Sequence, residues 1–203
     1  MTKEKIIPEA QAIKPDPNFM NVKDIDDSII IDLKYATADN FTGQIIYDFD
    51  TAVSRVGTVK KLGIAAKLFR DQGYLIKIWD AYRPTTAQQK MYDVYPVDAW
   101  VAKANPNYSH EKGVTFDMTL CDLDGNEVEM QSEFDDFTGK AKRDYPRTPE
   151  QEHNYQILKN TMEKAGFHDV NIIHSRAEEY AVMHREEFDV VTARAVARLN
   201  ILS

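Results

Sequence analysis

The chain is organised around one stretch, Tyr108-Ser109-His110-Glu111-Lys112-Gly113-Val114-Thr115-Phe116-Asp117-Met118-Thr119-Leu120. From Val114 onward apolar and polar residues alternate, which predicts a strand with Asp117 on its polar face. The Lys112-Gly113 pair permits a bend that brings His110 back over Asp117. Imidazole nitrogen and carboxylate oxygen are ordinary zinc ligands, and a catalytic zinc takes three protein ligands. The stretch therefore predicts two ligands of a zinc site, and a third must come from elsewhere in the chain.

Taken alone, a histidine and an aspartate at this spacing are a weak signal. A histidine at the end of a loop and an aspartate on a wet strand face give the same pattern. Three further segments of the chain strengthen the prediction of a zinc site. They are, in order, Asp32-Leu33-Lys34-Tyr35-Ala36-Thr37 with Asn40-Phe41-Thr42-Gly43, then Ile78-Trp79-Asp80-Ala81-Tyr82-Arg83-Pro84, then Phe134-Asp135-Asp136-Phe137.

Together the four motifs resemble the zinc D-alanyl-D-alanine dipeptidases, over residues 19–167. The zinc motif of that family, S-x-H-x-x-G-x-x-x-D, matches His110, Gly113 and Asp117, with Ser109 one place out of register. The resemblance implies an α+β fold, in which an antiparallel sheet with flanking helices carries the ligands, as in the hedgehog/DD-peptidase-like fold. It also implies one Zn2+ ion as cofactor and a small dipeptide, D-alanyl-D-alanine, as substrate.

Three residues outside the zinc motif take roles from the same resemblance. Arg83 follows a predicted strand, Tyr74–Trp79, which puts its guanidinium at the rim of a sheet. The resemblance implies that it acts there in catalysis, on the carbonyl oxygen as negative charge develops; a surface salt bridge is the alternative. Tyr35 is assigned to the substrate pocket, and Asp135 to the free ammonium group of the substrate. The alternative for Tyr35 is a ring in the core with its hydroxyl in water.

The resemblance breaks after the Gly-Phe pair Gly166-Phe167. In the family, the third zinc ligand and the general base follow such a pair as E-x-x-H, and this chain has no E-x-x-H there. We expect His174 to be the third ligand because it lies nearest in sequence to the family position, with His184 as the runner-up. Loss of the base predicts slower proton transfer to the leaving amine, by about 10²–10⁴-fold.

The tail, residues 168–203, resembles a second family. Val170–Glu179 followed by Phe188–Ala197 looks like part of the small-subunit rRNA guanine-N7 methyltransferases. The positions that match part of their S-adenosylmethionine pocket are Ala177, Glu178 and Arg194. The glycine-rich cofactor loop of a methyltransferase is missing. We therefore expect the tail to be a foreign segment joined to a dipeptidase-like domain, and we expect no response to S-adenosylmethionine.

The composition is that of a soluble globular protein, with 43% hydrophobic and 29% charged residues in a chain of 203. A formal net charge of -8 argues against a nucleic-acid partner. The single cysteine, Cys121, can form no internal disulfide, which suits a reducing compartment. The sequence shows neither a long apolar run nor a signal-peptide core. We expect a cytoplasmic protein without a membrane partner, and the sequence carries no prediction of oligomeric state.

Apolar residues recur at helical spacing in three segments, Val59–Gln72, Thr85–Tyr95 and Thr148–Gly166. The second helix is expected to begin with a capping box that runs from Thr85 to Gln88. A strand is predicted within Ile25–Leu33, and Asp122–Glu127 reads as a hairpin turn. Val170–Ile173 is β-branched and would fill the place of the family's last strand. Residues 1–18 carry prolines and mixed charge and are expected to form an extended arm.

The sequence supports two functions. The first is a zinc-dependent dipeptidase that hydrolyses D-alanyl-D-alanine, impaired by the loss of E-x-x-H. The second is a catalytically inactive binding protein with the same fold, a remnant that keeps a weak two-ligand metal site. Bound zinc without turnover would favour the second function.

Overall fold

The computed structural model describes residues 17–97, 101–142 and 145–167, and the backbone of 191–193. Most of the expected N-terminal arm and the expected strand at 170–173 lie outside these ranges. The division of the chain into 1–18, 19–167 and 168–203 stays a prediction.

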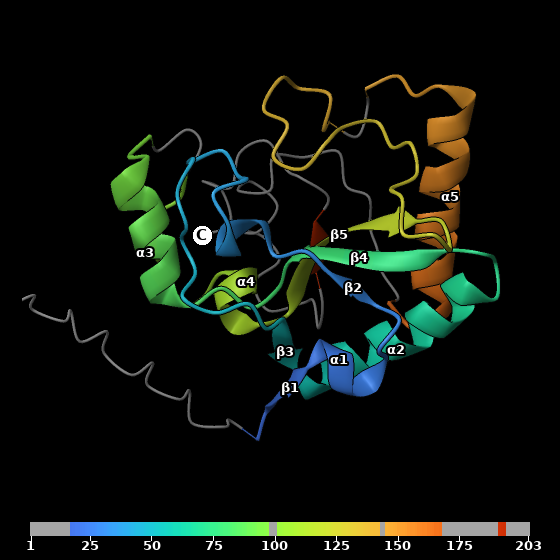
Figure 1. Ribbon diagram of the computed structural model, residues 1–203, viewed down its shortest axis with the longest axis horizontal. Helices are drawn as coiled ribbons and strands as arrows, with labels where there is room; N and C mark the ends of the chain where they lie inside the picture. The colour runs from blue at the N-terminus through green and yellow to red at the C-terminus, as the bar shows by residue number, and fades with distance from the viewer. Residues whose placement is uncertain (1–16, 98–100, 143–144, 168–190, 194–203) are drawn as a thin grey trace, which may run out of the picture.

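A four-stranded mixed sheet forms the centre of the molecule (Figure 1). Its strands, in spatial order, are β2 (Ile30–Ile31), β4 (Leu75–Asp80), β5 (Thr115–Cys121) and β6 (Val191–Ala193). β4 and β5 run antiparallel, whereas β2 is parallel to β4 and β6 is parallel to β5. The expected combination of helices and sheet is confirmed. The expectation of an antiparallel sheet is confirmed only in part: β4 and β5 are antiparallel, but a helix carries the chain from β2 back to the start of β4, which makes these two strands parallel.

A second, smaller sheet pairs β1 (Phe19–Asn21) with β3 (Val53–Arg55) in antiparallel register. A single helical turn, α1 (Val22–Ile25), follows β1, and a 3-10 turn at Lys34–Ala36 follows β2. The strand expected within Ile25–Leu33 is therefore confirmed, but it is only two residues long.

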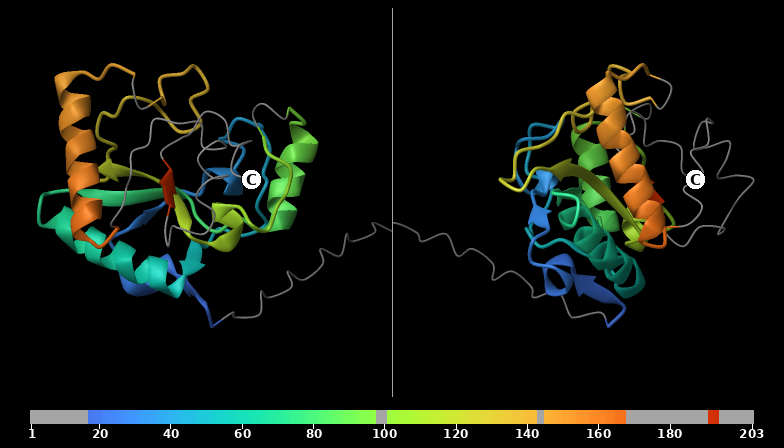
Figure 2. Two further views of the ribbon diagram at one scale, coloured as in Figure 1. Left: turned by 180° about the vertical axis from the view of Figure 1, so that it is seen from behind. Right: turned by 90° about the vertical axis from the view of Figure 1, so that its right-hand side faces the viewer.

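Three long helices surround the central sheet. α2 (Val56–Arg70) packs against β4 and against α5 (Pro149–Lys164), and α3 (Thr85–Val94) stands at the opposite end of the sheet from α5 (Figures 1 and 2). A short helix, α4 (Ser109–Lys112), precedes β5. The three helices predicted from apolar spacing are confirmed to within a few residues at their ends.

The caps of these helices differ from the expectation. Pro84 occupies the N-cap of α3 and offers no side-chain acceptor, so the capping box expected from Thr85 is wrong. A complete capping box is found instead at α5, where the Thr148 side chain accepts from the Gln151 backbone and the Gln151 side chain accepts from the Thr148 backbone.

β5 is buried along its whole length. All seven of its residues are inaccessible, including Thr115, Asp117 and Thr119 on the side expected to be wet. The expectation of a solvated polar face is wrong because β5 lies inside the sheet, between β4 and β6, and both of its faces are covered. Asp117 is therefore a buried carboxylate, which must be compensated by a positive charge or hydrogen bonds.

One hydrophobic core joins the sheet to the helices, with Phe69 of α2, Ile78 of β4 and Phe116 of β5 among its fully buried members. Gly125 takes a φ of 88° in the turn after β5, as expected for the Asp-Gly hairpin. Within the described ranges, the model contains no helix with the length and apolarity needed to cross a bilayer.

Gly113 ends α4 with a φ of 68°, and its carbonyl accepts from the Ser54 hydroxyl and from the Arg55 backbone N–H. We expect Gly113→Ala to destabilise the fold by about 2–3 kcal/mol, since an L-residue in this conformation costs about 1–2 kcal/mol. The added Cβ would also collide with the Phe19 ring. Gly43→Ala is the matched control, because it shares a positive φ of 65° but has no neighbour within 4 Å. Urea unfolding of both variants checks the difference, and equal losses would contradict it.

Candidate active site

His110 and Asp117 come together at the junction of α4 and β5. Nε2 of His110 lies 3.5 Å from Oδ2 of Asp117, and both side chains are buried. The left-handed turn at Gly113 makes this approach possible, since it folds α4 back over the first residues of β5. The structure therefore brings together the two predicted ligands.

The ring of His110 is held in one orientation. Nδ1 lies 2.8 Å from the carbonyl oxygen of Ala81, and a carbonyl only accepts, so Nδ1 carries the proton. Nε2 is then left with a lone pair directed toward Asp117, and it has no hydrogen-bond partner among the described residues. A backbone carbonyl on one ring nitrogen and an open second nitrogen are the usual arrangement of a metal-binding histidine. The site thus fits a cation.

The electrostatics around His110 are consistent with a cation site. Burial lowers the pKa of His110, but the carboxylates of Asp117 and Asp80 together more than offset it, and the pKa is raised from its ordinary value. The buried position opposite Asp117 thus favours positive charge. A metal ion would compete with a proton for Nε2.

Asp80 also lies in this cluster, since one atom each of Asp80, His110 and Asp117 fall within 4.8 Å of one another. Its oxygens are already occupied. Oδ1 accepts from the Tyr47 hydroxyl at 2.5 Å and from the Ala81 N–H at 2.8 Å. Oδ2 accepts two N–H groups of Arg83. A carboxylate offers about four acceptor sites, so Asp80 has none left for a metal.

Arg83 follows the end of β4, as expected from the sequence, and it is buried there, so the alternative of a surface salt bridge is wrong. Its side chain is only 1% exposed. Nε–H and Nη2–H donate to Asp80, and Nη1–H donates to Gln88. The guanidinium also lies 5.0 Å from the ring centre of Tyr35. Burial is possible because Asp80 neutralises the charge, and the bonds to Asp80 and Gln88 use three of the five N–H groups.

Tyr35 and Asp135, both assigned to the substrate from the sequence, are hydrogen-bonded to each other. The Tyr35 hydroxyl donates to Oδ2 of Asp135 at 2.7 Å, so it does not end in water. Burial raises the pKa of Asp135 to about 7, and the negative charge of Asp117 acts in the same direction. Asp135 also has a positive φ of 51°, unusual for a residue other than glycine.

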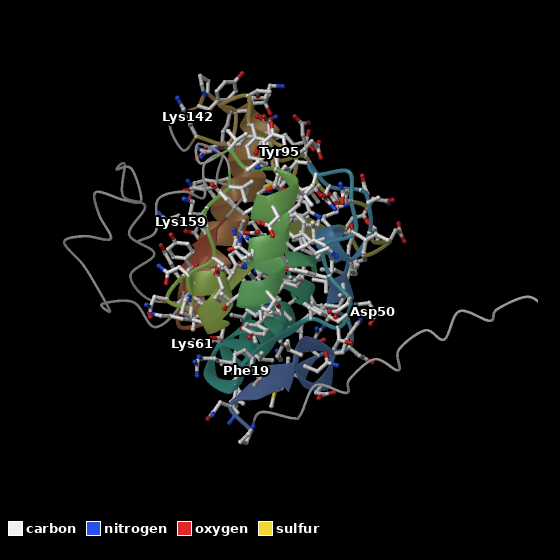
Figure 3. The ribbon with its side chains drawn as sticks, turned by 90° about the vertical axis from the view of Figure 1, so that its left-hand side faces the viewer. Phe19, Asp50, Lys61, Tyr95, Lys142 and Lys159 are labelled. Carbon is white, nitrogen blue, oxygen red and sulfur yellow. The ribbon has the colours of Figure 1, made fainter. Side chains whose placement is uncertain are left out.

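Aromatic rings surround this pair. Tyr35 makes edge-to-face contacts with Phe41, Tyr47 and Phe134. Phe41 in turn contacts Tyr95, which stands at the C-terminal end of α3 (Figure 3). These rings exclude water from the neighbourhood of Asp135, which accounts for the raised pKa of that carboxyl.

Several site residues were not anticipated from the sequence. Tyr47 and Gln88 complete the hydrogen-bond network of Asp80 and Arg83, and both are buried. For Gln88 the available signal was a polar residue between Ala87 and Met91 on the inward face of α3. Glu111 was also missed; its Oε1 is buried without a partner among the described residues, and burial raises its pKa.

Both histidines expected as the third ligand, His174 and His184, lie outside the described residues, so that expectation stays a prediction. The tail positions Ala177, Glu178 and Arg194 also lie outside them. One segment of the tail nevertheless lies beside the strand that carries Asp117, since β6 pairs with β5 and Ala193 stands opposite Asp117.

Comparison with known proteins gives two sets of relatives. A family described as D-ala-D-ala dipeptidase matches residues 16–173. A D-alanyl-D-alanine dipeptidase of Escherichia coli is 29% identical over 136 residues, covering 67% of this chain and 70% of the relative. One from Enterococcus faecium is 30% identical over 158 residues, covering 67% and 78%. The tail is similar to a ribosomal RNA small subunit methyltransferase G of Lactobacillus acidophilus, 54% identical over 49 residues, but spans only 20% of that relative.

Asp80 and Asp117 should respond differently to the same substitution. Asp117→Asn should weaken zinc binding by at least about 100-fold, because even residues that only support a ligand cost 10–100-fold. Asp80→Asn should weaken zinc binding only about tenfold, the lower end for a residue that supports a ligand, and should destabilise the fold by about 3–5 kcal/mol, since it strips a buried arginine of its counter-charge. Zinc titration calorimetry and urea unfolding measure the two effects. Folded Asp80→Asn protein that no longer binds zinc would make Asp80 a ligand.

Asp135 should make the stability of the metal-free protein fall with rising pH. The folded chain keeps the Asp135 proton up to about pH 7, whereas an unfolded chain releases it near 3.8. The folded state therefore binds more protons within this window, and its stability drops as pH rises through it. Asp135→Asn should remove this part of the pH dependence in thermal unfolding with a chelator present. Asp136→Asn is the control, because the pKa of Asp136 is lowered and lies below the window.

Proposed function

Because the chain belongs to the D-ala-D-ala dipeptidase family of metallopeptidases, we propose that it hydrolyses D-alanyl-D-alanine with the help of one zinc ion. The single observation that carries the proposal is the geometry of His110. Its Nδ1 is fixed by a backbone carbonyl, and its Nε2 is buried, unpaired and directed toward the Asp117 carboxylate. A buried, open imidazole nitrogen beside a carboxylate is costly unless a cation binds there.

His110 and Asp117 would hold the zinc ion, with His174 as the proposed third ligand and His184 as the runner-up. When bound, zinc supplies Lewis-acid chemistry at the carbonyl of the scissile bond. The pairing of β6 with β5 supports a contribution from the tail, since it brings chain beyond residue 190 alongside Asp117.

Arg83 is proposed to stabilise negative charge on the scissile carbonyl oxygen. Its charge is permanent, its environment excludes water, and two N–H groups remain uncommitted after the bonds to Asp80 and Gln88. Donors that are already oriented in a dry site cost no reorganisation during the reaction. Arg83 also donates its backbone N–H to the His110 carbonyl at 3.1 Å, so the guanidinium and the imidazole belong to one rigid unit.

Asp135 and Tyr35 are proposed to bind the free ammonium group of the dipeptide. Burial raises the pKa of Asp135 to about 7, and an incoming ammonium would favour its ionised form. The Tyr35 hydroxyl donates to the Asp135 carboxylate and so fixes its orientation. A buried counter-charge for the amine restricts the substrate to peptides with a free amino group near the scissile bond, which means dipeptides.

A binding protein without turnover is the second candidate function. The observation that favours it is the sequence after Phe167, which lacks the E-x-x-H that carries ligand and base in the family. The described residues supply only the two proposed ligands His110 and Asp117, and Glu111, which has one buried oxygen without a partner among them, lies inside the zinc motif rather than in the place of the family's base.

The decisive assay follows D-alanyl-D-alanine hydrolysis while zinc is titrated into metal-free protein. We expect turnover that depends on zinc and that disappears in His110→Ala. His153→Ala is the matched control, because His153 is exposed on α5. N-acetylated dipeptide should not be cleaved, since it lacks the ammonium group. Zinc binding without any turnover, in folded protein, would instead establish the binding protein.

Two more substitutions assign roles in the active protein. Arg83→Lys should lower kcat by about 10²–10³-fold, the usual effect of losing one oriented donor to the oxyanion. His174→Ala and His184→Ala should differ in zinc affinity, and the variant that loses zinc identifies the third ligand. Equal and full zinc binding by both would exclude the tail histidines.

A further inference from the structure

Arg83 meets Asp80 through a single oxygen atom. Nε–H and Nη2–H both donate to Oδ2 of Asp80, at 3.0 and 2.5 Å. In a bidentate pair each carboxylate oxygen takes one N–H, which fixes the plane of the guanidinium. Here the second oxygen is occupied by Tyr47 and by the Ala81 N–H. Two bonds to one atom allow the guanidinium to rock about that atom, so another contact must fix its plane.

Gln88 supplies that contact. Its Oε1 accepts the Nη1–H of Arg83 at 2.7 Å, away from the Asp80 edge, and its Nε2 donates to the Ala102 carbonyl at 2.7 Å. A guanidinium only donates and a carbonyl only accepts, so the amide cannot be turned round. Gln88 is 2% exposed, so both bonds lie in the low-dielectric interior, where hydrogen bonds are stronger.

The backbone holds Gln88 in this place. Its N–H donates to the Pro84 carbonyl at 3.0 Å, in the first turn of α3, immediately after Arg83 in the chain. Figure 3 shows α3 standing along one side of the molecule, beside the sheet that carries the site. Through Ala102, Gln88 also contacts the segment that leads toward α4 and His110.

We propose that Gln88 is a positioning residue for Arg83: it locks the plane of the guanidinium so that the two uncommitted N–H groups keep one direction. The proposal rests on the proposed function for the role of Arg83 in hydrolysis. The orientation of Arg83 itself does not depend on that function.

Gln88→Leu removes both hydrogen bonds and keeps most of the volume. In the zinc-loaded full chain we expect kcat to fall by about 10–100-fold, the effect of a small misplacement of a catalytic group. KM and zinc affinity should change by less than about threefold, since neither the ammonium site nor the ligands are touched. The matched control is Gln89→Leu, because Gln89 is the next residue of α3, is exposed and bonds only to Asp93 in the described structure.

Two variants separate positioning from a merely structural role. Gln88→Glu keeps an acceptor for Arg83 but loses the donor to Ala102, so it should retain most of kcat while losing stability. In an Arg83→Lys background, Gln88→Leu should cause no further loss of kcat, because lysine has no Nη1 to hold. A Glu variant as slow as the Leu variant, or additive losses in the double variant, would overturn the proposal.

Nitrogen-resolved NMR of the arginine side chains gives a readout that needs no activity. In wild-type protein the Nη protons of Arg83 should give separate, slowly exchanging signals, and Gln88→Leu should average them. If the Nη signals are separate in wild-type protein and averaged in Gln88→Leu, but wild-type protein shows no hydrolysis, the proposed function fails and the positioning of Arg83 stands. If hydrolysis is present and Gln88→Leu changes neither kcat nor these signals, the positioning role is wrong and the proposed function stands.

Discussion

The buried pair of Asp80 and Arg83 is the interaction on which the rest of the site depends. Moving a carboxylate into the interior costs several kcal/mol unless its acceptor sites are filled. Asp80 has no exposed surface, and its partners come from three different parts of the chain: Tyr47, the end of β4 and the start of α3. The hydrogen bonds that fill the acceptor sites of Asp80 therefore fix where β4 ends, where α3 begins and where the Ala81 carbonyl points. That carbonyl in turn sets the tautomer of His110.

The sequence predicted those parts of the site that are local. His110, Gly113 and Asp117 lie within eight positions, and one left-handed turn is enough to bring the two ligands together. Helices were predicted well because their apolar spacing repeats over several turns. Tyr47 and Gln88 were missed because their partners depend on the packing of separate segments, and a single buried polar residue carries no periodic signal.

Two errors share a physical cause, which is that a strand's surroundings are set by the layers around it. Alternation along β5 suggested a face exposed to solvent, yet every residue of the strand is buried, because both faces of the strand are covered. The direction of β2 relative to β4 depends on the path of α2, not on the residues of either strand. The sequence placed Arg83 just past β4 but could not predict its burial, which follows from the bonds to Asp80 and Gln88.

β6 pairs with β5, the strand that carries Asp117, although β6 belongs to a tail whose relatives are methyltransferases. Main-chain hydrogen bonds form between any two extended segments and are almost indifferent to side-chain identity. A sheet edge that recruits its last strand in this way can exchange that strand through recombination without rebuilding the core. In such an architecture the scaffold, with His110 and Asp117, is inherited as one module, while the chemistry contributed by the edge strand is free to diversify.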